Sequence, residues 1–210
     1  MKSTSLALLL IILSSFQGYS QKVALTETGE QVILHNDGTW EYASDTPLSS
    51  SEITTNEKKF VKDKSQSFLL KSTRTKVGMW IDGTTWSFAK GETEDDAEYN
   101  FQLKGEDLYA MLISEKMEIP LESLKAVAIE NAKSVAPDLR MDQEEYRNVN
   151  GVEVLMLRMS GTIEGIKFTY FGYYYSDANG TIQLITYTGS TLFADYQKDI
   201  EKFLNGFVRL

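Results

Sequence analysis

The last third of the chain constrains the fold most strongly, because it has the pattern of three strands followed by one amphipathic helix. The strand segments are rich in β-branched and aromatic side chains and cover residues 152–160, 166–175 and 181–189. Turn-forming residues separate them: Asn150-Gly151 before the first, Gly161 and Gly165 between the first two, and Asn179-Gly180 before the third. This pattern predicts an antiparallel sheet.

Apolar side chains occupy both faces of these strands, so both faces need cover. Two amphipathic helices are predicted to supply it, one from Leu121 to Ala136 after Pro120 and one from Leu192 to Asn205. Further strand segments are predicted at residues 67–72, 77–82, 85–90, 99–104 and 108–115. The predicted fold class is therefore α+β, with an antiparallel sheet sandwiched between helices.

The first part of the chain divides into three segments of different composition. Residues 1–20 combine Lys2, an apolar run and a small-x-small cleavage site, which is typical of an export signal peptide. Residues 21–43 have the turns and alternation of a small β-meander, and residues 44–60 are polar enough to predict a flexible linker. We therefore expect residues 61–210 to form the main domain.

Charge and residue usage exclude several classes of function. The net charge of −9 makes nucleic acid an unfavourable partner, since an acidic surface repels phosphates. The chain has no cysteine and one histidine, His35, which argues against thiol, serine-triad and zinc chemistry. Nothing in the sequence predicts a catalytic, cofactor or metal site, and no segment after residue 20 is apolar enough to span a membrane.

Two surface features are the binding candidates. The run at residues 92–98 includes Glu94, Asp95 and Asp96, which could form a solvated loop, bind a cation weakly or attract a basic partner. The aromatic hairpin supplies Tyr170, Tyr173, Tyr174 and Tyr175, which could line a binding groove or pack in the core. Tyr173 and Tyr175 should share one face, with Tyr170 and Tyr174 on the other. Tyr175, next to the turn, is the best candidate for exposure.

The order of elements resembles the PsbP-like family over roughly residues 67–208. The resemblance rests on Trp86 and Phe88 before the acidic loop, YNFQLKGEDLYAMLISE, the helix opening at Pro120-Leu121, VNGVEVLML, YFGYYYSDANGTIQLITYT and the closing IEKFLNGF. It implies an antiparallel sheet between helices, in a family whose members bind or assemble rather than catalyse. No binding residue is transferred by this resemblance.

Together these patterns predict an exported bacterial protein, periplasmic or secreted, that is not an enzyme and binds a protein or envelope component. Two alternatives remain open. One is an acid-dependent hydrolase of glycan or peptide, which would need two converging carboxylates in a pocket. The other is a small-molecule carrier that uses the aromatic hairpin.

Overall fold

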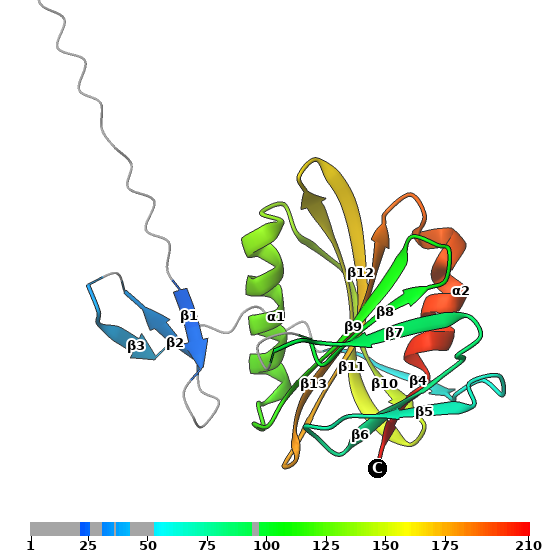
Figure 1. Ribbon diagram of the computed structural model, residues 1–210. Helices are drawn as coiled ribbons and strands as arrows, with labels where there is room; N and C mark the ends of the chain where they lie inside the picture. The colour runs from blue at the N-terminus through cyan, green and yellow to red at the C-terminus, as the bar shows by residue number, and fades with distance from the viewer. Residues whose placement is uncertain (1–21, 26–30, 36, 43–52, 94–96) are drawn as a thin grey trace, which may run out of the picture.

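The structure is a computed structural model that describes residues 22–25, 31–35, 37–42, 53–93 and 97–210 (Figure 1). Within these residues the chain forms a large eight-stranded sheet, two three-stranded sheets and two helices. The strands of the large sheet, in their order across it, are β4 (Thr55–Phe60), β10 (Arg140–Val149), β11 (Val152–Ile163), β12 (Ile166–Asp177), β13 (Gly180–Gly189), β9 (Leu108–Glu115), β8 (Tyr99–Leu103) and β7 (Trp86–Lys90).

Tight turns set the register at the centre of this sheet. Asn150 and Gly151 both have positive φ, 51° and 84°, and join β10 to β11. Glu164 and Gly165, with φ of 49° and 83°, join β11 to β12 in the same way. Positive φ at both central residues is the geometry that matches the twist of a two-residue hairpin.

Gly161 was expected in the turn between these strands but lies inside β11. A Cβ at Gly161 would approach the Cβ of Ala136 to 2.9 Å. The absent side chain therefore allows β11 to pass close to the end of the first helix. The turn itself lies at Glu164-Gly165 instead.

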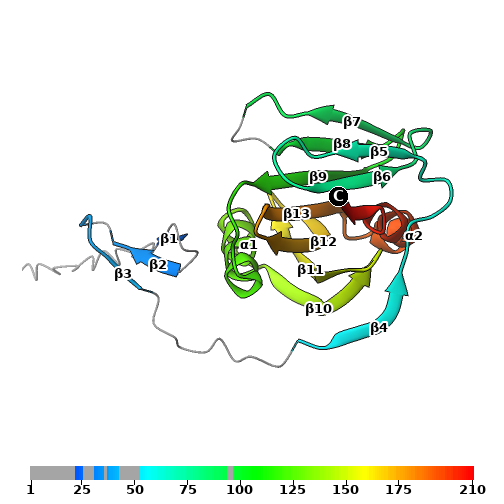
Figure 2. The same cartoon turned by 90° about the horizontal axis from the view of Figure 1, so that it is seen from below.

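The two faces of the large sheet are covered differently, and we name each after its helix. Helix α1 (Leu121–Val135) packs on one face, the α1 face, where Leu124 and Ala128 meet Leu155, Leu157 and Tyr174. Helix α2 (Phe193–Leu204) lies on the other, the α2 face (Figure 2).

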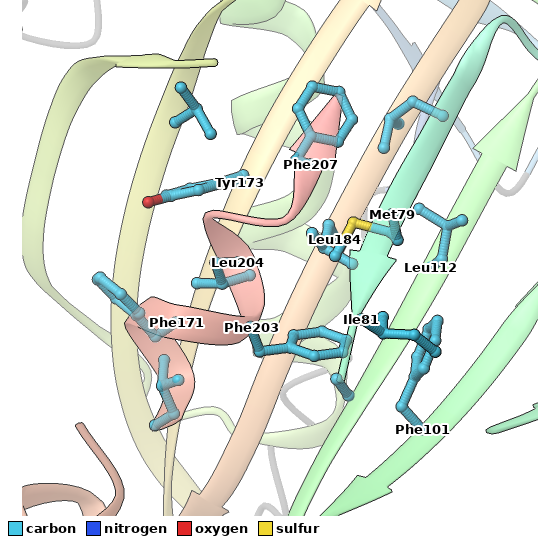
Figure 3. Close-up of a cluster of buried hydrophobic side chains, with 14 of the residues drawn as sticks. Met79, Ile81, Phe101, Leu112, Phe171, Tyr173, Leu184, Phe203, Leu204 and Phe207 are labelled. Carbon is cyan, nitrogen blue, oxygen red and sulfur yellow. The ribbon is translucent and has the colours of Figure 1, made fainter. Parts of the chain in front are cut away.

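A three-stranded sheet in the order β14-β6-β5 packs beside α2 in the same core. Its strands are β5 (Phe68–Lys71), β6 (Val77–Ile81) and β14 (Phe207–Arg209). In Figure 3, Met79 and Ile81 of β6 lie among Phe203 and Leu204 of α2, Leu184 of β13 and Phe207 of β14. Each fully buried side chain of this size contributes about 1.5–3 kcal/mol to stability.

The coarse prediction of a sheet-rich α+β fold with two helices is confirmed, but the predicted sandwich between helices differs in two respects. The large sheet is mixed rather than antiparallel, because β4 runs parallel to β10. In addition, α2 shares the second face with the β14-β6-β5 sheet, so strands supply much of that cover.

Three strands were not predicted, and one of them corrects the predicted linker at residues 44–60. Residues 55–60 form β4, an edge strand with a buried Phe60 but exposed charges. Charged side chains are typical of edge strands. Because of them, residues 55–60 lack the alternation of apolar and polar residues that predicts a strand. Strands β10 and β14 were missed because β10 is largely polar and β14 is short. Residues 44–52 lie outside the described residues.

The segment predicted as a β-meander contains the antiparallel sheet β1 (Lys22–Leu25), β2 (Gln31–Leu34) and β3 (Trp40–Tyr42). The predicted signal peptide, residues 1–20, lies outside the described residues. In the described part of the chain, neither helix is long and apolar enough to cross a membrane.

Candidate functional site

The tyrosines of the β12–β13 hairpin alternate between the two faces as predicted. Tyr173 and Tyr175 join the core on the α2 face, whereas Tyr174 packs under α1. Their exposed fractions are 1%, 8% and 1%, respectively. The expected exposure of Tyr175 is therefore wrong, and none of these three side chains is available for direct contact with a large partner.

Tyr175 is buried because the chain terminus folds back over it. The ring of Phe207 in β14 lies 5.5 Å from the ring of Tyr175, measured between centroids. The Tyr175 hydroxyl donates to Asp177 Oδ2 at 2.8 Å, and Arg209 Nε lies 3.2 Å from the same oxygen. Burial, then the bond to Asp177, raises the pKa of Tyr175 to about 12.

Tyr173 belongs to a buried polar network on the α2 face. Its hydroxyl donates to Asn205 Oδ1 at 2.9 Å and accepts from Arg147 at 3.4 Å. The guanidinium of Arg147 lies 4.5 Å from the Phe60 ring centroid and pairs with Glu145 at 2.5 Å. Because its members satisfy one another in the interior, this network links β4, β10, β12 and the end of α2 and has a structural role.

Tyr170 is the one predicted tyrosine that remains partly accessible, and two unpredicted tyrosines flank it in a row across the sheet. The register places Tyr170 of β12 opposite Tyr187 of β13, and Tyr187 opposite Tyr109 of β9. The ring centroids of Tyr170 and Tyr187 are 6.0 Å apart, and those of Tyr187 and Tyr109 are 5.5 Å apart with nearly parallel planes. All three side chains are half-buried.

We call these three tyrosines, with Met111 and Ile185 in the neighbouring row, the tyrosine face. It lies on the α1 face of the sheet. The core under α1 is formed by Leu155, Leu157 and Tyr174, with Ile185 packed at its border, and none of the three tyrosines of the row belongs to it. Figure 2 shows α1 at one flank of the sheet, with β7, β8 and β9 extending beyond it.

The polar tips of the tyrosine face are available for a ligand. Within the described residues, the hydroxyls of Tyr170 and Tyr187 have no hydrogen-bond partner, and Tyr109 reaches Asp107 only at 3.5 Å. Burial raises the pKa of Tyr170 and Tyr187, so both phenols are neutral donors at physiological pH. The arrangement offers rigid aromatic area edged with hydrogen-bonding groups.

Register reasoning could have found Tyr187. The turn at Ala178-Asn179 pairs Asp177 with Gly180, and counting back along both strands places Tyr170 opposite Tyr187. Tyr109 required knowledge that β9 pairs with β13, a contact between segments far apart in the sequence that no local pattern indicates.

The predicted acidic residues Glu94, Asp95 and Asp96 lie outside the described residues, but the base of their loop is described. Glu98 is fully buried, and its carboxylate accepts hydrogen bonds from Thr73, Ser72 and Ser114. Burial alone would raise the pKa of Glu98, but these hydrogen bonds outweigh it and hold the pKa below the ordinary value of 4.5. Glu98 therefore anchors the loop as a carboxylate.

Two carboxylates, Asp138 and Glu98, lack the raised pKa that a general acid needs. Asp138 receives hydrogen bonds from the Thr162 hydroxyl and backbone N–H, both at 2.7 Å, which lower its pKa. A general acid needs a raised pKa, so Asp138 and Glu98 are unsuited to that role. Among the described residues no group of three or more His, Cys, Asp or Glu could hold a metal ion.

No protein-family profile and no curated protein matches the chain. Among solved structures, it is similar to the solution structure of the cyanobacterial PsbP from Synechocystis. That match has a TM-score of 0.51 and 13% sequence identity, covering 68% of this chain and 92% of that chain. A Pseudomonas aeruginosa protein of unknown function, described as a putative regulator, matches with a TM-score of 0.44 and 12% identity over 68% of this chain and 96% of that chain. The similarity to the cyanobacterial protein supports the distant PsbP-like fold expected from the sequence.

Proposed function

We propose that this chain is an exported, non-enzymatic binding or assembly domain that docks a protein partner on the tyrosine face. The observation that carries the proposal is the row of half-buried tyrosines, Tyr170, Tyr187 and Tyr109, across three adjacent strands. Neighbouring rings lie 6.0 Å and 5.5 Å apart. A sheet holds such a row rigidly, so little conformational entropy is lost when a partner binds.

Tyrosine suits protein recognition because it combines a large apolar ring with a hydroxyl that still needs a hydrogen bond. It is enriched among the residues that dominate binding energy at protein interfaces. Met111 and Ile185 extend the apolar area beside the rings, and both are half-buried. A partner that covers this area would gain both apolar burial and hydrogen bonds to the free hydroxyls of Tyr170 and Tyr187.

The export part of the proposal rests on the signal-like residues 1–20, and a PsbP-like fold is consistent with it. The net charge of −9 favours a protein over a nucleic acid as partner. That the chain is not an enzyme is part of the proposal, supported by the lack of cysteine and the single histidine in its sequence.

The test is quantitative co-purification of the mature protein from its native envelope with Tyr187→Ala and Phe88→Ala variants. Phe88 is the matched control, because it is 42% exposed and its ring packs with Tyr99 and Phe101 of the α2-face core. We expect Tyr187→Ala to reduce the specific partner at least tenfold and Phe88→Ala to leave it unchanged. Equal retention by both variants would refute the tyrosine face, and a bound glycan in place of a protein would refute the choice of partner.

A further inference from the structure

A polar pocket has its floor on the α2 face of the large sheet, the face opposite the tyrosine face. It encloses about 400 Å³. It lies where one end of β10, β11 and β12 meets the connection between β13 and α2, and its lining includes Arg140, Ser160, Lys167, Thr169 and Ser190. Ser160, Thr169 and Thr188 lie in one row across β11, β12 and β13, in register with Leu108 of the α2-face core.

Hydroxyl groups form the floor of this pocket and are oriented to donate. Ser160 and Thr169 are only 8% and 6% exposed. Ser160 Oγ accepts from Arg140 Nη2 at 3.3 Å, and Ser190 Oγ accepts from Thr169 Oγ1 at 2.9 Å. Since each of these serines already acts as acceptor, each retains an O–H whose acceptor is missing among the described residues.

Two cations flank the floor from opposite sides. Arg140 lies on β10 and Lys167 on β12, with β11 between them. Lys167 lies opposite Thr162, two residues along β11 from the Ser160 that Arg140 pairs with. Two strand spacings and this offset separate the two backbones by about 12 Å, a span that two long side chains and a small molecule can bridge. The ammonium of Lys167 has no acceptor in the described part of the chain, and Arg140 uses one of its five N–H groups on Ser160.

The two carboxylates in the lining contribute differently. Both oxygens of Asp138 accept hydrogen bonds from Thr162, so this group is engaged in holding β11. Asp142 is exposed at the rim and makes no hydrogen bond or ion pair that the structure shows. Arg158, two residues from Ser160 on the same face of β11, lies over the Phe193 ring and is not part of the lining. The side chains that remain free to bind a ligand are therefore mainly donors.

We propose that this pocket binds the anionic group, a carboxylate or a phosphate, of a small molecule. Arg140 and Lys167 supply the charge, and the free hydroxyls of Ser160 and Ser190 supply directed hydrogen bonds. Charge-assisted bonds of this kind are stronger than neutral ones. The lining contains no aromatic side chain, which disfavours a neutral sugar held by ring stacking.

The test is NMR titration of the full mature protein with succinate, inorganic phosphate and glucose at constant ionic strength. We expect saturable shifts at the Ser160, Thr169 and Ser190 amides with succinate or phosphate and none with glucose; the tighter of the two anions identifies the group. Arg140→Gln and Lys167→Gln should each weaken binding at least tenfold, whereas Lys133→Gln, an exposed lysine of α1 paired with Glu130, should not.

Thermal unfolding of the variants provides the folding control, since Arg140 and Lys167 are both exposed and their loss should leave the midpoint nearly unchanged. Three results would overturn the proposal. The first is the lack of a saturable shift up to 50 mM anion, a concentration roughly a hundredfold above the dissociation constant of a submillimolar site. The others are equal anion affinity of the folded variants and the wild type, or an affinity for glucose comparable with that for the anions.

Discussion

Tyr175→Ala distinguishes a structural from a binding role for the aromatic hairpin. The side chain is 8% exposed, its ring packs on Phe207, and its hydroxyl donates to Asp177. Truncation of a buried aromatic residue to alanine costs about 3–5 kcal/mol. The lost hydrogen bond to Asp177 adds little to this cost, because the Asp177 carboxylate keeps its ion pair with Arg209 and its hydrogen bond from the Asn179 N–H.

The expected loss of unfolding free energy is therefore about 3–5 kcal/mol for Tyr175→Ala. Tyr175→Phe keeps the ring and should lose about 1 kcal/mol, the usual net contribution of one hydrogen bond. Tyr187→Ala removes a half-buried ring and should lose about 0.8–1.5 kcal/mol of unfolding free energy, roughly half the value for full burial.

Urea unfolding, followed by tryptophan fluorescence and circular dichroism, gives these free energies. If Tyr175→Ala costs less than about 1 kcal/mol, the ring does not support the core as its burial indicates. If the folded Tyr175→Ala protein instead loses its partner while Tyr187→Ala retains it, the original assignment of Tyr175 to the binding surface is correct and the tyrosine face is wrong.

Two further predictions concern the buried anchors of the fold. Glu98→Gln should lower stability by about 2 kcal/mol at pH 7, because a buried carboxylate with charge-assisted hydrogen bonds is lost. Since the folded pKa of Glu98 lies below its ordinary value of 4.5, its contribution is present above that value and fades as the pH falls. Denaturation measured from pH 7 to pH 3 should therefore show the difference in unfolding free energy between wild type and Glu98→Gln becoming smaller as the pH falls. A difference that stays constant would contradict this linkage between protonation and stability. A chain beginning at residue 61 should be at least about 3 kcal/mol less stable than one beginning at residue 53, since it lacks β4 and the buried Phe60 that packs on Arg147. Equal stability of the two chains would show that β4 is dispensable.

Local patterns predicted the elements whose signals are contained in a short stretch of sequence. The strands of the central hairpins were marked by β-branched and aromatic runs, and Asn150-Gly151 fixed a two-residue turn. Helices α1 and α2 were found within one or two residues of their bounds, because a single apolar stripe identifies each.

The remaining features depend on contacts between distant segments. Strand β4 carries a charged sequence that becomes a strand only because β10 offers it a parallel partner. The burial of Tyr175 depends on its contact with Phe207 of β14. Strand β14 is held there by pairing with β6, which lies more than a hundred residues earlier in the sequence. The complete candidate site could not be predicted for the same reason, because Tyr109 joins Tyr170 and Tyr187 only through the pairing of β9 with β13.

Site-specific photocrosslinking in the native envelope tests the central claim most directly. A photoreactive phenylalanine analogue replaces Tyr187 in one variant, Phe88 in a second and Tyr175 in a third, and crosslinked protein is measured after irradiation. The tyrosine face predicts a strong, discrete protein adduct at position 187 and little or none at positions 88 and 175. Adducts at position 88 with none at position 187 would contradict the account.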